Sequence, residues 1–161
     1  MKYIRTFEDI EKLNYDNYYL FTAIRFNNLE KSSELINSGM DLNIRDEEGD
    51  TPLIKAVTHG RIQIVKELID ADVDLDIQGK KGNTALIWSS ISYNIDIMKL
   101  LIEGGCDWNI KNNHGDDFLD YAKYNAKYKK DLVMTYEDII RIYTDQYNEY
   151  LAKKVAEKYN L

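Results

Sequence analysis

The sequence contains a segment that recurs every 33 residues without a gap, and this period constrains the fold more than any other feature. Residues 41–73 and residues 74–106 are two complete copies, and residues 107–122 begin a third. Residues 16–40 form an earlier copy that lacks the leading extended segment. A fixed period of this size is typical of chains that stack one small structural unit several times. We therefore expect an array of similar units, each packing on its neighbours.

Equivalent positions in the copies keep the same chemistry. Apolar and small side chains recur in register at several positions of the unit: Leu20, Leu53, Leu86 and Leu119; Ala23, Ala56, Ser89 and Ala122; Leu29, Ile62 and Ile95; Leu35, Leu68 and Leu101. Glycines recur at one turn position: Gly49, Gly82 and Gly115. One short unit cannot bury its apolar face alone, so we expect the recurring apolar side chains to face the neighbouring units.

Local signals predict two short helices in each unit. Thr51 precedes Pro52, which places an N-cap hydroxyl directly before a proline at the first helical position. Thr84 and Asp117 supply the same cap in the next two copies. Gly60 ends the first helix, because glycine tolerates a positive φ.

A second helix follows the first. Its apolar residues have helical spacing: Ile62, Val65, Leu68 and Ile69. This helix is predicted to close near Ala71. The next segment, from Asp74 to Gly82, has no helical periodicity and ends in a glycine turn, which predicts an extended hairpin arm.

The residues in this order resemble the ankyrin repeat. The resemblance rests on Gly-Asp-Thr-Pro-Leu-Ile-Lys-Ala at 49–56, with Asp-Leu-Asn at 41–43 before it and Ile-Val-Lys-Glu-Leu-Ile at 64–69 after it. The family's TPLH signature reads TPLI at 51–54, TALI at 84–87 and DFLD at 117–120, so its histidine is missing from every copy. In the family that histidine helps to tie the loops together, which implies that another contact replaces it here.

The resemblance covers about residues 16–125 and implies an all-α ankyrin-repeat solenoid of stacked helix-turn-helix units with short β-hairpin arms. The residues beyond it add the expectation of a long C-terminal helix. The expected divisions are an N-terminal capping segment (1–15), repeats over 16–134 (about 16–40, 41–73, 74–106 and 107–134) and a C-terminal capping helix (135–161). Within the capping segment, residues 6–13 are expected to form a separate short helix. Polar Lys31, Ser32 and Ser33 in the first copy are expected to face solvent, as in a terminal repeat.

The C-terminal part departs from the repeat. The register fails after Ala126, and Thr135 is expected to cap a new helix with a tyrosine-rich apolar stripe. Two interpretations remain open for this helix. It caps the end of the solenoid, or residues 135–159 make a homodimer or dock a partner, since tyrosine combines apolar area with a polar tip.

Composition narrows the classes of partner. The net charge of −7 disfavours nucleic acid, and no apolar run approaches the roughly 20 residues needed to cross a membrane. The single cysteine, Cys106, cannot form an internal disulfide, which agrees with a reducing compartment. We expect a cytoplasmic protein, with the nucleus as the alternative.

The sequence offers no constellation of catalytic or metal-binding residues. His59 and His114 lie on different repeats, and neither has a cysteine or a second histidine at metal-ligand spacing. Cys106 occupies a small apolar position where relatives carry alanine, and no G-x-S-x-G elbow or P-loop is present. We therefore predict no enzyme, no cofactor and no metal site.

The resemblance implies that a protein partner is bound by the hairpin tips and the concave face of the first helices. Carried over by register, the candidate residues are Arg45, Glu47, Glu48, Lys55 and His59 in one copy, Gln78, Lys80, Lys81, Trp88 and Ile91 in the next, and Lys111, Asn113, His114, Tyr121 and Tyr124 in the third. The tips run from acidic to basic to mixed. Trp88, Ile91, Tyr121 and Tyr124 are the composition expected of a binding hot spot, although Trp88 also suits packing between adjacent first helices.

A non-catalytic adaptor or effector is thus the predicted function. Two alternatives stand beside it: self-assembly through the C-terminal helix, and service as a substrate. For the second, Asn43 and Asn109 lie where ankyrin repeats resemble targets of cytosolic asparaginyl hydroxylation, while Asp76 replaces asparagine in the middle copy.

Overall fold

The computed structural model describes residues 7–128 and residue 156, with side chains from residue 15 to residue 125 and at residue 156. The described elements are α1 (Phe7–Phe26), α2 (Leu29–Ile36), α3 (Pro52–Thr58), α4 (Ile62–Asp70), the 3-10 helix η1 (Lys80–Gly82), α5 (Ala85–Ile91), α6 (Ile95–Glu103) and α7 (Phe118–Tyr128). The chain divides into two compact units, Met1–Tyr121 and Ala122–Leu161.

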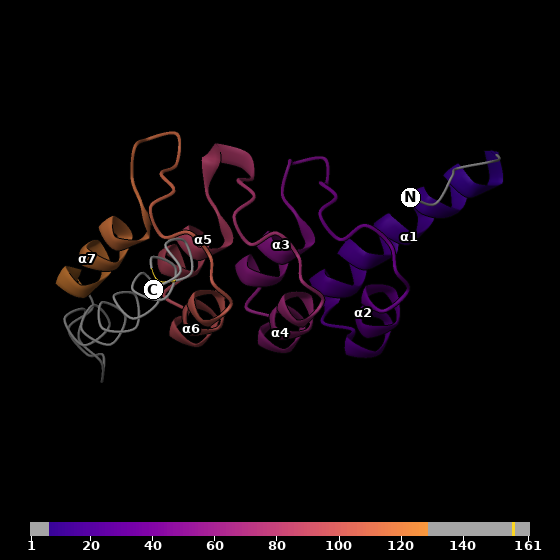
Figure 1. Ribbon diagram of the computed structural model, residues 1–161, viewed down its shortest axis with the longest axis horizontal. Helices are drawn as coiled ribbons and strands as arrows, with labels where there is room; N and C mark the ends of the chain where they lie inside the picture. Colours follow the sequence, from indigo (N-terminus) through magenta and orange to yellow (C-terminus); the bar gives the residue numbers. More distant parts are fainter. Residues whose placement is uncertain (1–6, 129–155, 157–161) are drawn as a thin grey trace. The chain divides into compact units, whose positions relative to one another are not determined.

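In the first unit the helices form two rows. The helices α1, α3 and α5 lie side by side in one row, and α2, α4 and α6 lie in the other (Figure 1). Each helix packs on its partner in the same copy and on its equivalent in the next copy. The three loop arms that follow α2, α4 and α6 project from the same side of the rows (Figure 1). The array predicted from the 33-residue period is therefore present.

The predicted helix caps are confirmed. The Oγ1 atoms of Thr51 and Thr84 accept hydrogen bonds from the backbone N–H three residues ahead, at 3.2 Å and 3.3 Å. Asp117 Oδ1 accepts from the backbone N–H groups of Leu119 and Asp120, at 2.9 Å and 3.2 Å. These bonds satisfy N–H groups that the first turn of a helix leaves without intrahelical partners.

The end of the first helix is also as predicted, with φ of 65° at Gly60. At the equivalent positions, Asn27 has φ of 56° and Tyr93 has φ of 58°. The backbone conformation is thus conserved through the array although glycine occurs in one copy only. Asparagine tolerates the left-handed region better than most residues, whereas tyrosine rarely adopts it.

The recurring leucines form the core of the array. Leu20, Leu53 and Leu86 in the first helices are at most 2% exposed, and Leu35, Leu68 and Leu101 in the second helices are at most 3% exposed. The prediction is wrong for another set. Leu29 and Ile62 are 41% and 42% exposed. They stand at the first position of the second helix, before the buried stripe of that helix begins.

The N-terminal helix is longer than expected. A single helix, α1, runs from Phe7 to Phe26, so the separate short helix over residues 6–13 is wrong. Neither glycine nor proline occurs between residue 7 and residue 26, and nothing in the local sequence forces the helix to end. The capping contacts expected of residues 1–15 involve side chains that lie, apart from Tyr15, outside the described ones.

The polar residues of α2 do not form the solvent-facing cap that we expected. Ser32 is fully buried and its Oγ donates to the carbonyl of Leu29 at 3.0 Å. Ser33 Oγ donates to Glu67 Oε2 on α4 at 2.6 Å, so it joins two repeats. Lys31 forms an ion pair on its own helix, with Glu34 at 2.8 Å. A small hydroxyl can be buried when it bonds locally, because a satisfied polar group avoids the desolvation penalty.

The arms are loops without β-strands among the described residues. Each arm is closed by a backbone hydrogen bond from a residue to the carbonyl four positions on: Asp46 to Asp50, Gly79 to Asn83 and Asn112 to Asp116, at 2.9–3.0 Å. The expected β-hairpins are therefore short turns. Their tips are held by these bonds and by side chains.

The C-terminal part is described only in its beginning. Helix α7 has 11 residues, whereas α3 and α5 have seven each. The register fails after Ala126 because this first helix continues where its equivalents stop. The helix expected over residues 135–161 lies outside the described residues. None of the helices in the described part of the chain is both long and apolar enough to cross a membrane.

Candidate functional site

A groove of about 850 Å³ lies beside the first arm. One wall is a face of α1 formed by Asn17, Tyr18, Phe21, Thr22 and Arg25. The other wall consists of the arm residues 45–48 together with Lys55 and His59 of α3. Five of the sequence-predicted site residues are therefore brought together here: Arg45, Glu47, Glu48, Lys55 and His59. The five residues of α1 were not predicted.

Lys55 is the electrostatic centre of the arm wall. Its side chain is 16% exposed, and its Nζ lies 3.0 Å from Asp46 Oδ2 and 3.3 Å from Asp50 Oδ2. It also donates a hydrogen bond to Glu48. Burial by itself lowers the pKa of Lys55, but the three carboxylates outweigh this effect and raise the pKa well above its usual value. The hydrogen bond from Lys55 in turn lowers the pKa of Glu48. Lys55 and Glu48 thus favour each other's charged form.

A ladder of long side chains fastens each arm to the next. Arg45 Nη1 donates to the carbonyl of Gly49 in its own arm at 2.6 Å and to the carbonyl of Gln78 in the second arm at 2.7 Å. Gln78 Nε2 repeats this pattern with the carbonyls of Gly82 and Lys111, at 2.6 Å and 2.9 Å. Lys111 Nζ donates to the carbonyl of Gly115 at 3.1 Å. Arg45 and Gln78, at one register position, thus join neighbouring arms in the same way, and Lys111 repeats only the bond within its own arm.

A second set of contacts locks the arms together. Asp50 Oδ1 accepts from the backbone N–H of Lys80 at 3.0 Å. A Cβ atom at Gly79 would lie 2.2 Å from the same oxygen, so glycine is required for this approach. Asn83 Oδ1 accepts from Asn112 Nδ2 at 2.9 Å. These bonds tie the loops in an array without the signature histidine, as the sequence implied that some contact must.

The comparison with known families agrees with this geometry. The family model described as ankyrin repeats (3 copies) matches residues 7–79 and 62–135. The chain belongs to the ankyrin-repeat family. No curated protein matches the sequence. Ankyrin repeats are in general protein–protein interaction modules, and the family is in general non-catalytic.

Within this ankyrin array, several residues predicted to bind a partner have internal contacts. Arg45, Gln78 and Lys111 form the ladder, and Lys55 is enclosed by carboxylates. Tyr121 is half-buried, and its hydroxyl accepts from Asn112 Nδ2 at 3.1 Å and donates to Asp116 Oδ2 at 3.4 Å. The sequence does not distinguish these residues from free surface groups. The acceptors of Arg45 and Gln78 include a backbone carbonyl in the next copy, and the carboxylates that enclose Lys55 are brought to it by the fold of the arm.

Other predicted residues lie at the surface of the array. Lys80, Lys81, Asn113 and His114 are exposed at the second and third arms, although Asn113 also donates its backbone N–H to the carbonyl of Lys81 at 3.0 Å. Trp88 and Ile91 are half-buried on α5. The indole Nε1 of Trp88 is buried without a hydrogen-bond partner. Tyr124 belongs to the second unit and is 63% exposed.

The two candidate modification sites have exposed side chains with structural tasks in the ankyrin arms. Asn43 Oδ1 accepts from the backbone N–H of Asp74 in the next arm at 3.0 Å. Asp76 repeats this bond with the N–H of Asp107 at 2.8 Å, so a carboxylate substitutes for the amide in the middle copy. Asn109 donates from Nδ2 to Asp107 Oδ1 at 3.0 Å.

The cysteine and histidines of the ankyrin array do not converge. Cys106 is 4% exposed, and burial raises the pKa of its thiol to about 12, so it remains protonated and a poor nucleophile. The ring Nδ1 of His59 lies 2.9 Å from the carbonyl of Lys55 on its own helix. No group of three or more His, Cys, Asp or Glu side chains is placed to hold a metal ion among residues whose side chains are described.

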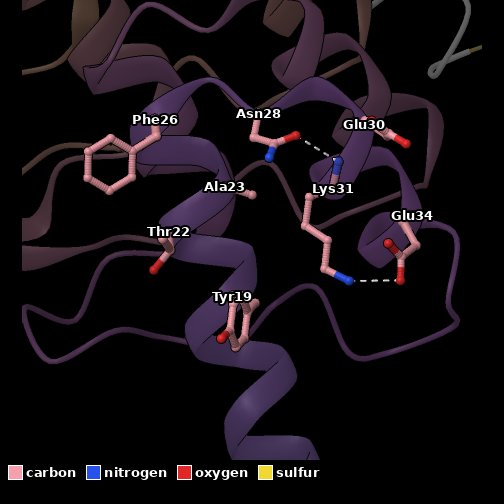
Figure 2. Close-up of a pocket in the computed structure, with 8 residues that line it drawn as sticks. All are labelled: Tyr19, Thr22, Ala23, Phe26, Asn28, Glu30, Lys31 and Glu34. Atoms are coloured by element: carbon pink, nitrogen blue, oxygen red, sulfur yellow. Dashed lines mark hydrogen bonds and ion pairs between the residues drawn. The ribbon is translucent and has the colours of Figure 1, made fainter.

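A smaller hollow of about 430 Å³ lies between α1 and α2 (Figure 2). Its rim includes Phe26, which is 72% exposed. Three of the residues on its α2 side interact with one another: Asn28 Oδ1 accepts from the backbone N–H of Lys31 at 3.0 Å, and Lys31 Nζ pairs with Glu34 at 2.8 Å (Figure 2). None of the residues predicted as binding residues lines this hollow. The groove beside the first arm is therefore the stronger candidate site.

Proposed function

We propose that the chain is a non-catalytic adaptor that binds a protein partner on the face formed by the arms and the first helices. The observation that carries this proposal is the groove of about 850 Å³, where a face of α1 meets the first arm. Its size suits an inserted loop or peptide segment. Its aromatic wall includes Tyr18, which is 67% exposed, and tyrosine is enriched at protein interfaces.

The hydrogen bonds between the arms also support a role in binding a protein partner. The ladder of Arg45, Gln78 and Lys111 fixes loops that would otherwise lose conformational entropy when a partner binds. Exposed side chains such as Glu47, Lys80 and Lys81 therefore project from a pre-organised frame. The exposed side chains are acidic at the first arm and basic at the second. This change in charge favours one orientation of a bound partner.

A comparative pull-down tests the proposal. The full chain is immobilised and exposed to cytosol, and captured proteins are identified by mass spectrometry. The groove variant combines Tyr18→Ala with Glu47→Lys. The control variant combines Tyr15→Ala with Glu103→Lys, which makes the same changes at exposed sites outside the groove; Tyr15 is 61% exposed. A protein retained by the wild type and the control but lost by the groove variant supports the proposal.

A second variant, Trp88→Ala with Lys80→Glu and Lys81→Glu, tests the contribution of the second arm and α5. Loss of the same protein from this variant extends the binding face to the second repeat. Identical captured proteins for the wild type and both altered surfaces would overturn the proposal.

Three further points remain predictions: self-assembly through residues 135–159, the hydroxylation of Asn43 and Asn109, and the cytoplasmic location. Light scattering, intact-mass measurement after treatment with an asparaginyl hydroxylase, and cell imaging test them in turn.

A further inference from the structure

The groove occupies the position that a preceding arm would take. In the first copy, positions 8–17, which are the register equivalents of 41–50, belong to the helix α1 and form no arm. Asn17 and Tyr18 of α1 are the register equivalents of Asp50, the last residue of the first arm, and Thr51, the N-cap residue of α3. The first arm therefore has a neighbouring arm on one side and the groove on the other.

Groups that are paired between the later arms are unpaired in the groove. The carbonyls of Gln78 and Lys111 each accept a hydrogen bond from a long side chain of the preceding arm, at 2.7 Å and 2.9 Å. The equivalent carbonyl, that of Arg45, receives no such donor from the described residues. Asn17 Oδ1, on the opposite wall, is buried and also without a donor. A buried acceptor without a partner is costly, so Asn17 Oδ1 favours a ligand that brings donors. The Arg45 carbonyl belongs to an exposed residue and can accept from the same ligand.

The charges at the arm end of the groove favour a cation. The arm contains four carboxylates within residues 46–50, of which Asp46, Glu48 and Asp50 share Lys55. Glu47 is exposed and has no ion pair among the described residues. Arg45 directs Nη1 to two carbonyls and forms no ion pair with a described carboxylate. The exposed ring of Tyr18 adds a surface on which a guanidinium or ammonium group packs favourably.

We infer that the groove binds an extended loop of a partner protein that inserts an arginine or lysine side chain at the arm end. Arginine and lysine supply donors without acceptors, which matches the oxygens of Asn17, Arg45 and Glu47. Arg25 lies seven residues, or roughly 10 Å, along α1 from Tyr18 and disfavours a cation at the far end. The loop therefore has one preferred direction. This inference rests on the proposed function and specifies the partner's chemistry.

Selection from a phage-displayed library of random dodecapeptides on the immobilised full chain tests the inference. The wild type is expected to enrich peptides with arginine or lysine at a fixed position. A selected peptide should bind Glu47→Gln about tenfold more weakly, because a charge-assisted bond is lost. Its binding should also weaken as salt concentration rises. The control variant Glu103→Gln should bind as the wild type does, and thermal melts should show that both variants are folded.

Several results would overturn the inference. One is the absence of enriched peptides, since a single loop is expected to suffice. Another is a set of enriched peptides without a basic residue, or basic peptides whose affinity is equal for the wild type, Glu47→Gln and Tyr18→Leu. A third is a concentration-dependent dimer that Glu47→Gln disrupts, which would make a second copy of the chain the occupant. The proposed function is judged separately, by the pull-down, so its failure is distinguishable from each of these results.

Discussion

The two sides of the first arm differ although the arm itself is one rigid loop. On the side of the second arm, Arg45 donates to the carbonyl of Gln78 and Asp50 accepts from the N–H of Lys80. On the side of α1, the carbonyl of Arg45 and Asn17 Oδ1 have no donors from described residues. Between two neighbouring arms, donors of one arm thus meet acceptors of the other. Where the repetition stops, the equivalent groups have no donor among the described residues, and we propose that a ligand supplies one.

The largest expected effect comes from breaking the close contact between the second and third arms. Gly82 has φ of 75°, and a Cβ there would lie 2.4 Å from Asn113 Oδ1. Gly49 has φ of 84°, but a Cβ would meet nothing within 4 Å. Gly82→Ala should lower the free energy of unfolding by about 3 kcal/mol, and Gly49→Ala by about 1 kcal/mol. Urea denaturation of the two variants measures the difference; equal losses would show that the arms do not pack tightly.

Removing the cation from the arm wall should have the next largest effect. Lys55→Met leaves three carboxylates facing one another, and we expect a loss of about 2 kcal/mol at neutral pH. The pKa of Glu48 is lowered by Lys55, so the stability from this pairing is present above the unfolded carboxyl pKa. It is lost as the pH falls through the lowered folded value. The stability gap between wild type and Lys55→Met, measured by denaturation, should therefore shrink in acid. A constant gap down to about pH 2 would contradict this account.

Changing the unpaired acceptor should stabilise the chain while it weakens binding. Asn17→Leu removes a buried oxygen that has no donor, and we expect about 1 kcal/mol of added stability. The affinity for a basic peptide selected on the wild type should fall. Denaturation of this variant tests the expected gain in stability, and peptide titration tests the expected loss of affinity. A loss of stability would mean that the oxygen has a partner in solution.

The smallest expected effect is at Glu47. Its side chain is exposed and has no ion pair among the described residues, so Glu47→Gln should change the free energy of unfolding by less than about 0.5 kcal/mol. Denaturation of Glu47→Gln and of Lys55→Met under the same conditions compares two residues of the arm wall of the groove. A large destabilisation of Glu47→Gln would show that Glu47 is a structural residue like its neighbours.

Much of the fold follows from patterns that are local in sequence. The 33-residue register and the caps at Thr51, Thr84 and Asp117 are readable because each depends on residues a few positions apart. The candidate site is only partly readable. The arm residues of the groove were found by register, whereas Phe21 and the rest of the α1 wall were missed. The signal that points to them is the absence of an arm from residues 16–40.

The sequence by itself determined the period, the helix pairs and the buried leucines, because burial of a repeated apolar stripe requires only that similar units stack. Only the tertiary structure decided which polar side chains form hydrogen bonds between copies of the repeat and which remain at the surface. Ser33, Arg45 and Gln78 find their partners in another copy of the repeat, on α4 or in the next arm. A hydrogen bond over such a separation depends on how neighbouring copies pack, and this information is not contained in any one copy.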